Sequence, residues 1–148
     1  MKTQISLFIT IIFILGCESN HSYPWVINTT YADLLKIAGE KLILLDFETE
    51  WWSWCDRLDA DTYSDPSVVS FARENLINLK IDAEKGEGIE LAEKYNIRGF
   101  PTIVFTNNRG DEIDRIVGYK DPDQFFSELS RIKSGRNTLP TLLTDFQT

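Results

Sequence analysis

The run Leu42–Leu45 constrains the fold most, because four large apolar residues follow one another with no polar residue between them. Such a run predicts a strand that is buried on both faces, which requires helices on both sides of its sheet. Apolar periodicity and turn residues predict further strands at residues 76–82, 102–106 and 112–118, and helices at 31–38, after 55, and at 65–75, 88–96 and 121–133. This order predicts an α/β fold with a central mixed β-sheet flanked by helices on both faces.

The first sixteen residues have the pattern of an export signal. Lys2 is followed by the apolar run Ile5–Leu15, which is too short to cross a bilayer as a stable helix. The run ends in "ILGC", which resembles the cleavage box of bacterial lipoproteins. In that family the cysteine becomes the first mature residue and carries lipid, so the resemblance implies that Cys17 is lipidated. An uncleaved anchor and an ordinary signal peptide are the alternatives.

This interpretation divides the chain into four segments. We expect a lipoprotein signal peptide at 1–16, a lipidated tether at 17–25, a folded domain at 26–133 and a C-terminal tail at 134–148. The tail restarts an apolar pattern and is either a docked segment or a frayed end. The expected location is the bacterial cell envelope, on the periplasmic side or the outer surface, with membrane attachment through the lipid on Cys17.

Charge and cysteine content narrow the function classes. The chain carries a net charge of −8 and has no basic stripe that would neutralise phosphates, which excludes a nucleic-acid-binding surface. It contains 2 cysteines. Since Cys17 is the expected lipid site, Cys55 has no intramolecular partner, which is unusual in an oxidising compartment.

Three motifs together resemble the thioredoxin family, in particular its exported bacterial members with a WCxWC centre. They are "LLDF", "EWWSWC" and "YNIRGFPTIVF", and the resemblance extends over about residues 26–133. It implies a thioredoxin-like fold. It also implies that Trp52 occupies the position of the family's first, attacking cysteine, and that Cys55 is the second, resolving cysteine.

The same resemblance assigns two further positions. Asp46 matches the acid that the family buries under its active site, and Pro101 matches the proline that is cis in the family. A cis Phe100-Pro101 bond is therefore predicted. Such a turn exposes backbone that an extended peptide can pair with. The alternatives are that this turn is only structural, and that Asp46 is only a retained polar residue held by water or Lys80.

The missing cysteine removes the family's reaction. Dithiol exchange needs a thiolate that attacks a disulfide and a second thiol that resolves the mixed disulfide, and the indole of Trp52 is not a nucleophile. We therefore expect a degenerate active site in a non-catalytic protein- or peptide-binding module. The alternative is a monothiol redox protein that uses Cys55, placed in the first turn of a helix by a capping box of Ser53 and Asp56.

Three tryptophans in four residues cannot all point inward at a junction between a strand and a helix. We expect an exposed apolar patch, and the candidate binding residues are Trp51, Trp52, Trp54, Phe100 and Pro101. The expected partner is an extended peptide or an envelope protein. Neither a cofactor nor a metal site is predicted.

Overall fold

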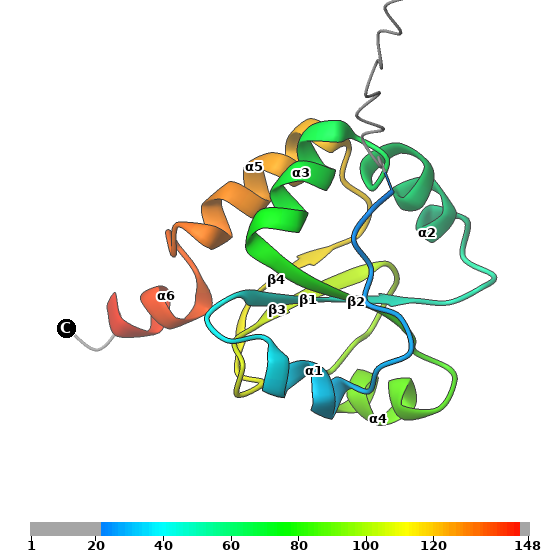
Figure 1. The fold of residues 1–148 in the computed structure, drawn as a ribbon, viewed down its shortest axis with the longest axis horizontal. Coiled ribbons are helices and arrows are strands. Elements are labelled where there is room, and N and C mark those ends of the chain that lie inside the picture. The colour runs from blue at the N-terminus through cyan, green and yellow to red at the C-terminus, as the bar shows by residue number, and fades with distance from the viewer. Residues whose placement is uncertain (1–21, 146–148) are drawn as a thin grey trace, which may run out of the picture.

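The computed structural model describes residues 22–145. Its centre is a four-stranded sheet in the order β2-β1-β3-β4 (Figure 1). The strands are β1 (Leu42–Glu48), β2 (Leu76–Asp82), β3 (Thr102–Thr106) and β4 (Glu112–Val117). β2 pairs with β1 in parallel, whereas β1 with β3 and β3 with β4 are antiparallel.

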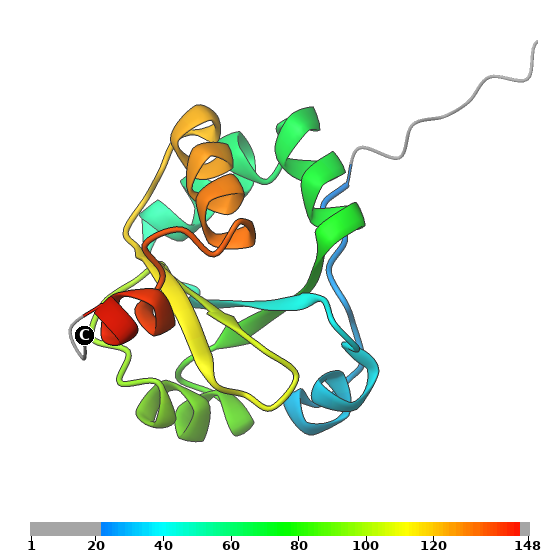
Figure 2. The same cartoon turned by 90° about the vertical axis from the view of Figure 1, so that its left-hand side faces the viewer.

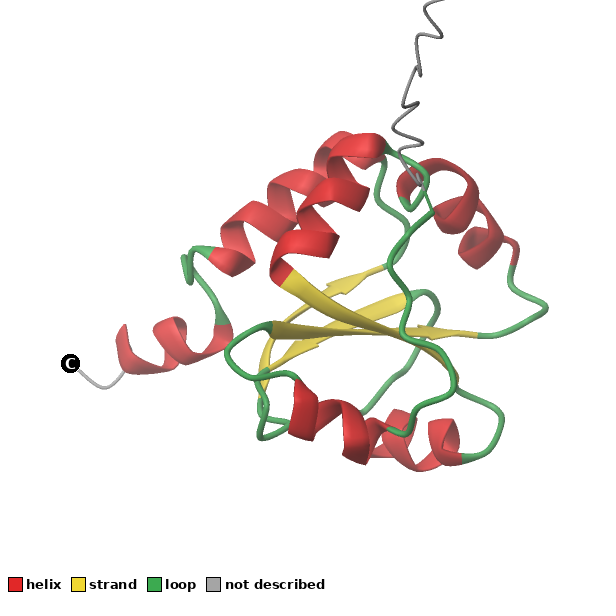
Figure 3. Cartoon of the chain, viewed as in Figure 1, coloured by secondary structure: helices red, strands yellow, loops and turns green. Residues whose placement is uncertain are grey.

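Helices cover both faces of this sheet, as Figures 2 and 3 show. One face carries α1 (Tyr31–Ile37) and α4 (Glu87–Lys94). The other carries α2 (Ser53–Arg57), the π-helical turn η1 (Leu58–Thr62), α3 (Pro66–Asn75) and α5 (Pro122–Lys133). The predicted α/β architecture with a mixed central sheet is confirmed.

The apolar run in β1 is buried as predicted. Ile43, Leu44 and Leu45 have no exposed surface. Leu44 packs in the core beneath α3 and α5, while Ile43 and Leu45 pack in the core beneath α1 and α4. Because successive side chains of a strand point to opposite faces, one unbroken apolar run serves both cores.

Capping side chains mark the start of three helices. Thr30, Asp65 and Asp121 are the N-caps of α1, α3 and α5, and each side chain accepts a hydrogen bond from a backbone amide of the first turn. Proline follows the cap in α3 and in α5, where its missing N–H costs nothing.

The predicted tether is wrong in its last residues, because the chain is packed against the domain from Ser22 onward. Tyr23 is only 7% exposed and its hydroxyl donates to Asn78 Oδ1 (3.2 Å). Trp25 forms a parallel bridge with Asn78 at the edge of β2. The aromatic rings of Tyr23 and Trp25 pack on Tyr63, so the folded domain begins before residue 26.

The C-terminal tail contains a docked helix, α6 (Leu139–Asp145), which contacts β4. Thr138, just before it, is buried, while Leu139, Leu142 and Leu143 are exposed. Across residues 22–145, no helix has both the length and the apolarity needed to cross a membrane. The predicted signal peptide and the lipid site Cys17 lie outside the described residues.

Candidate functional site

The candidate site lies where β1 leads into α2. Trp52 is the N-cap residue of α2, and Cys55 is the third residue of the helix. The amide of Cys55 donates to the carbonyl oxygen of Trp52 (2.9 Å). The predicted capping box is wrong, since no side chain caps this helix and Ser53 is already its first residue. Cys55 is nevertheless in the first turn, as predicted.

The thiol of Cys55 is shielded and neutral. The residue is 4% exposed. Burial raises the pKa of the Cys55 thiol to about 11, with smaller contributions in the same direction from Asp46 and Glu48, against a hydrogen bond from the Thr49 backbone and the charge of Lys80. At neutral pH very little thiolate exists, and the thiolate is the nucleophile of sulfur chemistry.

Asp46 lies in β1 and is buried, as the resemblance implied. Burial raises the pKa of its carboxyl to about 7, and the ammonium of Lys80, 3.9 Å from Oδ2, partly opposes that effect. Within residues 22–145, neither Oδ1 of Asp46 nor the buried hydroxyl of Tyr63 meets a partner at ordinary hydrogen-bond geometry, although Tyr63 lies close enough to Asp46 to lower the pKa of its carboxyl slightly. Lys80 alone therefore does not satisfy this carboxyl group.

Three carboxylates gather around Lys80. Oxygen atoms of Asp46, Glu48 and Asp59 lie within 4.8 Å of one another, a spacing that could suit a metal ion. The Lys80 ammonium lies 2.6 Å from Glu48 Oε2 and 2.6 Å from Asp59 Oδ2. Lys80 therefore supplies the positive charge in this group, and the four side chains form an ion-pair cluster.

The tryptophans form an exposed surface, as predicted. The exposed fractions are 64% for Trp51, 38% for Trp52 and 45% for Trp54. The ring of Trp51 meets that of Trp52 edge-on at 5.3 Å. The indole N–H of Trp51 donates to Glu84 Oε2 (2.8 Å), so this side chain is held toward the loop after β2.

An open groove of about 360 Å³ joins the α2 tryptophans to the loops around β3 and β4. It is lined by Trp52, Trp54, Phe100, Gly118 and Tyr119. The Arg57 guanidinium lies 4.8 Å from the centre of the Tyr119 ring and 5.5 Å from that of Trp54. We refer to this feature as the aromatic groove.

The Phe100-Pro101 peptide bond is cis, which confirms the prediction. Pro101 is buried and its carbonyl oxygen accepts a hydrogen bond from the amide of Gly118 (2.9 Å). This hydrogen bond holds the loop before β3 beside the end of β4, where Tyr119 follows. The sequence did not identify Tyr119 or Arg57 as site residues. The available signals were an aromatic residue after the last predicted strand and a basic residue in the helix that follows the tryptophans.

The structure thus brings Trp52, Trp54 and Phe100 together in one groove, whereas Trp51 lies outside it. Cys55 and Asp46 are buried and do not line it. The groove is therefore lined mainly by aromatic side chains.

Comparison with known proteins agrees with this architecture. The family described as "Thioredoxin-like domain" matches residues 32–133. The thiol:disulfide interchange protein DsbD of Photorhabdus laumondii is 29% identical over 121 residues, and that of Pasteurella multocida is 31% identical over 113 residues. These matches cover 78% and 72% of this chain, but only 21% and 19% of the much longer relatives.

Solved structures give the same result. A thioredoxin from Thermus thermophilus superimposes with a TM-score of 0.65 at 26% identity, over 75% of this chain and 87% of that one. A protein of Bacteroides thetaiotaomicron that is proposed to be a disulphide-isomerase has a TM-score of 0.61 at 34% identity, over 77% and 94%. The chain therefore belongs to the thioredoxin-like domain family and is related to part of the DsbD thiol:disulfide interchange proteins.

Proposed function

We propose that this chain is a non-catalytic thioredoxin-like binding module of the bacterial cell envelope, attached to a membrane through lipid on Cys17, whose aromatic groove takes an extended peptide or a segment of an envelope protein. One observation carries the proposal: Trp52, at the position of the family's attacking thiol, is exposed and lines the aromatic groove. No cofactor enters the proposal.

The residues at the site favour this function over the one that the relatives' names describe. Exchange requires an accessible thiolate and a second thiol. Here the family's attacking position is an indole, and the remaining thiol of Cys55 is buried with a raised pKa. A monothiol redox protein using Cys55 is the alternative, and it would need the helix to open before the thiol could react.

The groove has the composition of a contact surface. Four aromatic side chains line it, and two of them are the exposed Trp52 and Trp54. Tryptophan and tyrosine contribute strongly to binding when a partner covers them. Because Trp52 and Trp54 project outward, their apolar surface is available to a partner and contributes little to the core.

The test is capture of envelope proteins by the intact chain and by three single variants, with and without reductant. We expect Trp52→Ala to abolish capture and to change the free energy of unfolding by less than about 1 kcal/mol, because the side chain is not packed in a core. The matched control is Trp51→Ala, which removes an exposed indole outside the groove and should leave capture unchanged.

The third variant, Cys55→Ser, separates the two candidate functions. The binding module predicts that this variant captures partners normally and that reductant has no effect. Capture that depends on Cys55 and disappears in reductant would instead support the monothiol protein. Captured proteins should then be competed off by a synthetic extended peptide from the bound segment, and failure of every such peptide would contradict the groove as the binding site.

A further inference from the structure

Hydrogen bonds hold the N-terminal segment against the domain from Ser22 onward. Arg73 Nη2 donates to the Ser22 carbonyl oxygen (2.9 Å), and the Tyr23 hydroxyl donates to Asn78 (3.2 Å). On the next residues, Asn78 Nδ2 donates to the Pro24 carbonyl oxygen (3.3 Å), and the amide of Val26 donates to the carbonyl oxygen of Asn78 (2.8 Å). The position of the chain at Ser22 is therefore fixed relative to the rest of the domain.

This segment enters the domain on the side of α3 and α5. Ser22 and Tyr23 lie beside Tyr63 and Ser64, just before α3, where they line a shallow hollow. In Figure 1 the segment, in blue, then crosses β2 to reach α1 on the opposite face. Figure 2 shows α3 between this segment and α5. The point of attachment is thus on the face opposite to α1 and α4.

The connection to a lipid on Cys17 is short, an argument that rests on the lipid anchor of the proposed function. Four residues, 18–21, separate Cys17 from Ser22. Five chain steps of about 3.3–3.6 Å reach at most about 18 Å. A domain of this length has a radius of gyration of about 14 Å and so a width of about 35 Å. The connection is too short to pass around the domain, so it cannot place the opposite face, that of α1 and α4, against the bilayer.

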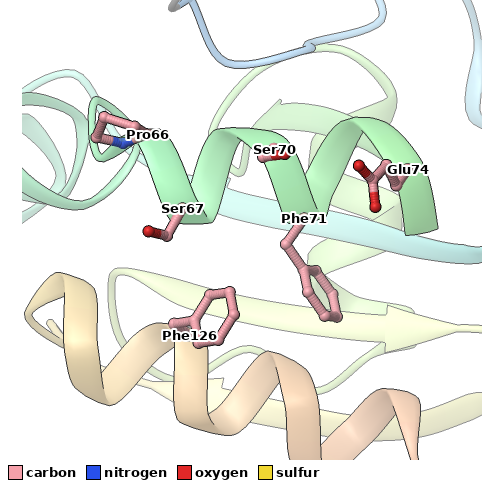
Figure 4. Close-up of a pocket in the computed structure, with 6 residues that line it drawn as sticks. All are labelled: Pro66, Ser67, Ser70, Phe71, Glu74 and Phe126. Atoms are coloured by element: carbon pink, nitrogen blue, oxygen red, sulfur yellow. The ribbon is translucent and has the colours of Figure 1, made fainter.

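We infer that the face formed by α3 and α5 lies against the bilayer that holds the anchor, with α1 and α4 turned away. The interaction surface is the groove between these two helices, about 440 Å³ in volume and shown in Figure 4. The rings of Phe71 and Phe126 lie in it 5.7 Å apart, and Phe126 is exposed.

The chemistry of this groove fits a lipid surface. Its lining combines two phenylalanines with Pro66, two serine hydroxyls and one carboxylate, that of Glu74. Apolar rings next to small polar groups match the boundary between acyl chains and headgroups. Since the whole chain carries a net charge of −8, apolar contact and the anchor, rather than attraction to anionic lipid, hold this face in place.

The experiment uses the full-length protein purified from bacterial membranes and reconstituted into phosphatidylethanolamine–phosphatidylglycerol vesicles that contain a nickel-chelating lipid. A nitroxide is attached at Ser70→Cys in α3 or at Glu93→Cys in α4, both exposed positions. Labelling is selective because Cys55 is buried and the lipid occupies Cys17. We expect the nickel to enhance relaxation several-fold more at position 70 than at position 93.

A second pair of labelled proteins carries fifteen additional Gly and Ser residues after Asn20. This insertion should make the two positions equal, because the chain is then long enough for the domain to turn. Mass spectrometry of the N-terminal peptide reports the lipid. A chain without lipid would overturn the anchor and the orientation together. A lipidated chain with equal enhancement at both positions before the insertion, or with more at position 93, would overturn the orientation alone and leave the anchor standing.

Discussion

At the scale of single residues, the most consequential feature is Asp46, a carboxyl group buried in the central strand β1. Asp46 has one oxygen without a hydrogen-bond partner among the described residues and the other 3.9 Å from the Lys80 ammonium. A buried charge with incomplete pairing destabilises the folded state. We therefore expect the ionised carboxylate of Asp46 to cost stability.

The first prediction is that Asp46→Asn stabilises the protein above pH 7. Burial raises the folded-state pKa of Asp46 from 3.8 to about 7. Between these values the unfolded chain releases the proton while the folded chain keeps it, so stability falls as pH rises and then levels off. At about 1.4 kcal/mol per pKa unit, the gain in the variant reaches up to about 4 kcal/mol at pH 8.5.

Urea titrations at pH 4 and pH 8.5 measure this difference. At pH 4 the folded carboxyl is protonated and the unfolded one is only about half ionised, so the variant should differ by less than about 1 kcal/mol. Lys80→Gln is the contrasting variant, because it removes the neighbouring positive charge and should destabilise the protein most at high pH. An equal effect of Asp46→Asn at both pH values would refute the burial argument.

At the scale of elements, the N-terminal segment and Tyr63, the residue that ends η1, form one aromatic cluster. The rings of Tyr23, Trp25 and Tyr63 lie 4.4 to 4.9 Å apart. The Lys80 ammonium lies 5.2 Å from the centre of the Trp25 ring. This cluster connects a segment before the first helix to the turn after α2, and it closes one end of the core beneath α3 and α5.

The second prediction concerns Tyr23→Ala, which should lower the free energy of unfolding by about 3–4 kcal/mol, because a buried aromatic side chain is removed from a packed core. Thermal and chemical unfolding measure the loss. Ile27→Ala is the matched control: Ile27 is 76% exposed, and its removal should change stability by less than about 0.5 kcal/mol. Equal effects of the two substitutions would mean that the segment is only a tether.

The contrast between predicted and observed elements has a physical origin. Periodicity identified the strands and the helices α1, α3, α4 and α5, because each has a continuous buried stripe or run. The docking of Tyr23 was not predictable in this way, since it depends on Tyr63, 40 positions later in the chain, and local polarity around Asn20 resembles a linker. The π-helical turn η1 has no sequence pattern of its own.

The site shows the same division. The cis bond at Pro101, the burial of Asp46 and the exposure of the tryptophans agree with expectations taken from motifs. The capping box failed because the strand-to-helix loop ends one residue earlier, at Trp52. Tyr119 lies in the groove beside Trp54, which is 65 positions earlier in the chain, and no local window contains that contact.

At the scale of the whole molecule, the chain has the thioredoxin-like scaffold of its relatives. The sheet order, the cis turn and the buried thiol and acid are all present. The exposed Trp52 stands at the start of α2, where the resemblance to the family places the attacking cysteine.

The third prediction is that Trp52→Cys gives measurable disulfide reduction in an insulin assay, because an exposed thiol would then precede the buried thiol of Cys55 in the family's order. The control is the same variant combined with Cys55→Ser, which should show no turnover. Absence of activity in a folded Trp52→Cys variant would mean that the surrounding groove, including Tyr119 and Arg57, no longer admits a disulfide substrate.

The distribution of the tryptophans has a spectroscopic consequence. Three of the 4 indoles lie exposed on α2 and the loop before it, while only Trp25 packs against the core. Intrinsic emission of the folded protein therefore reports mainly on a water-exposed surface and not on the interior. The natural chain carries its own fluorophores at the aromatic groove, so a partner that covers them shifts the emission to shorter wavelength without any added dye.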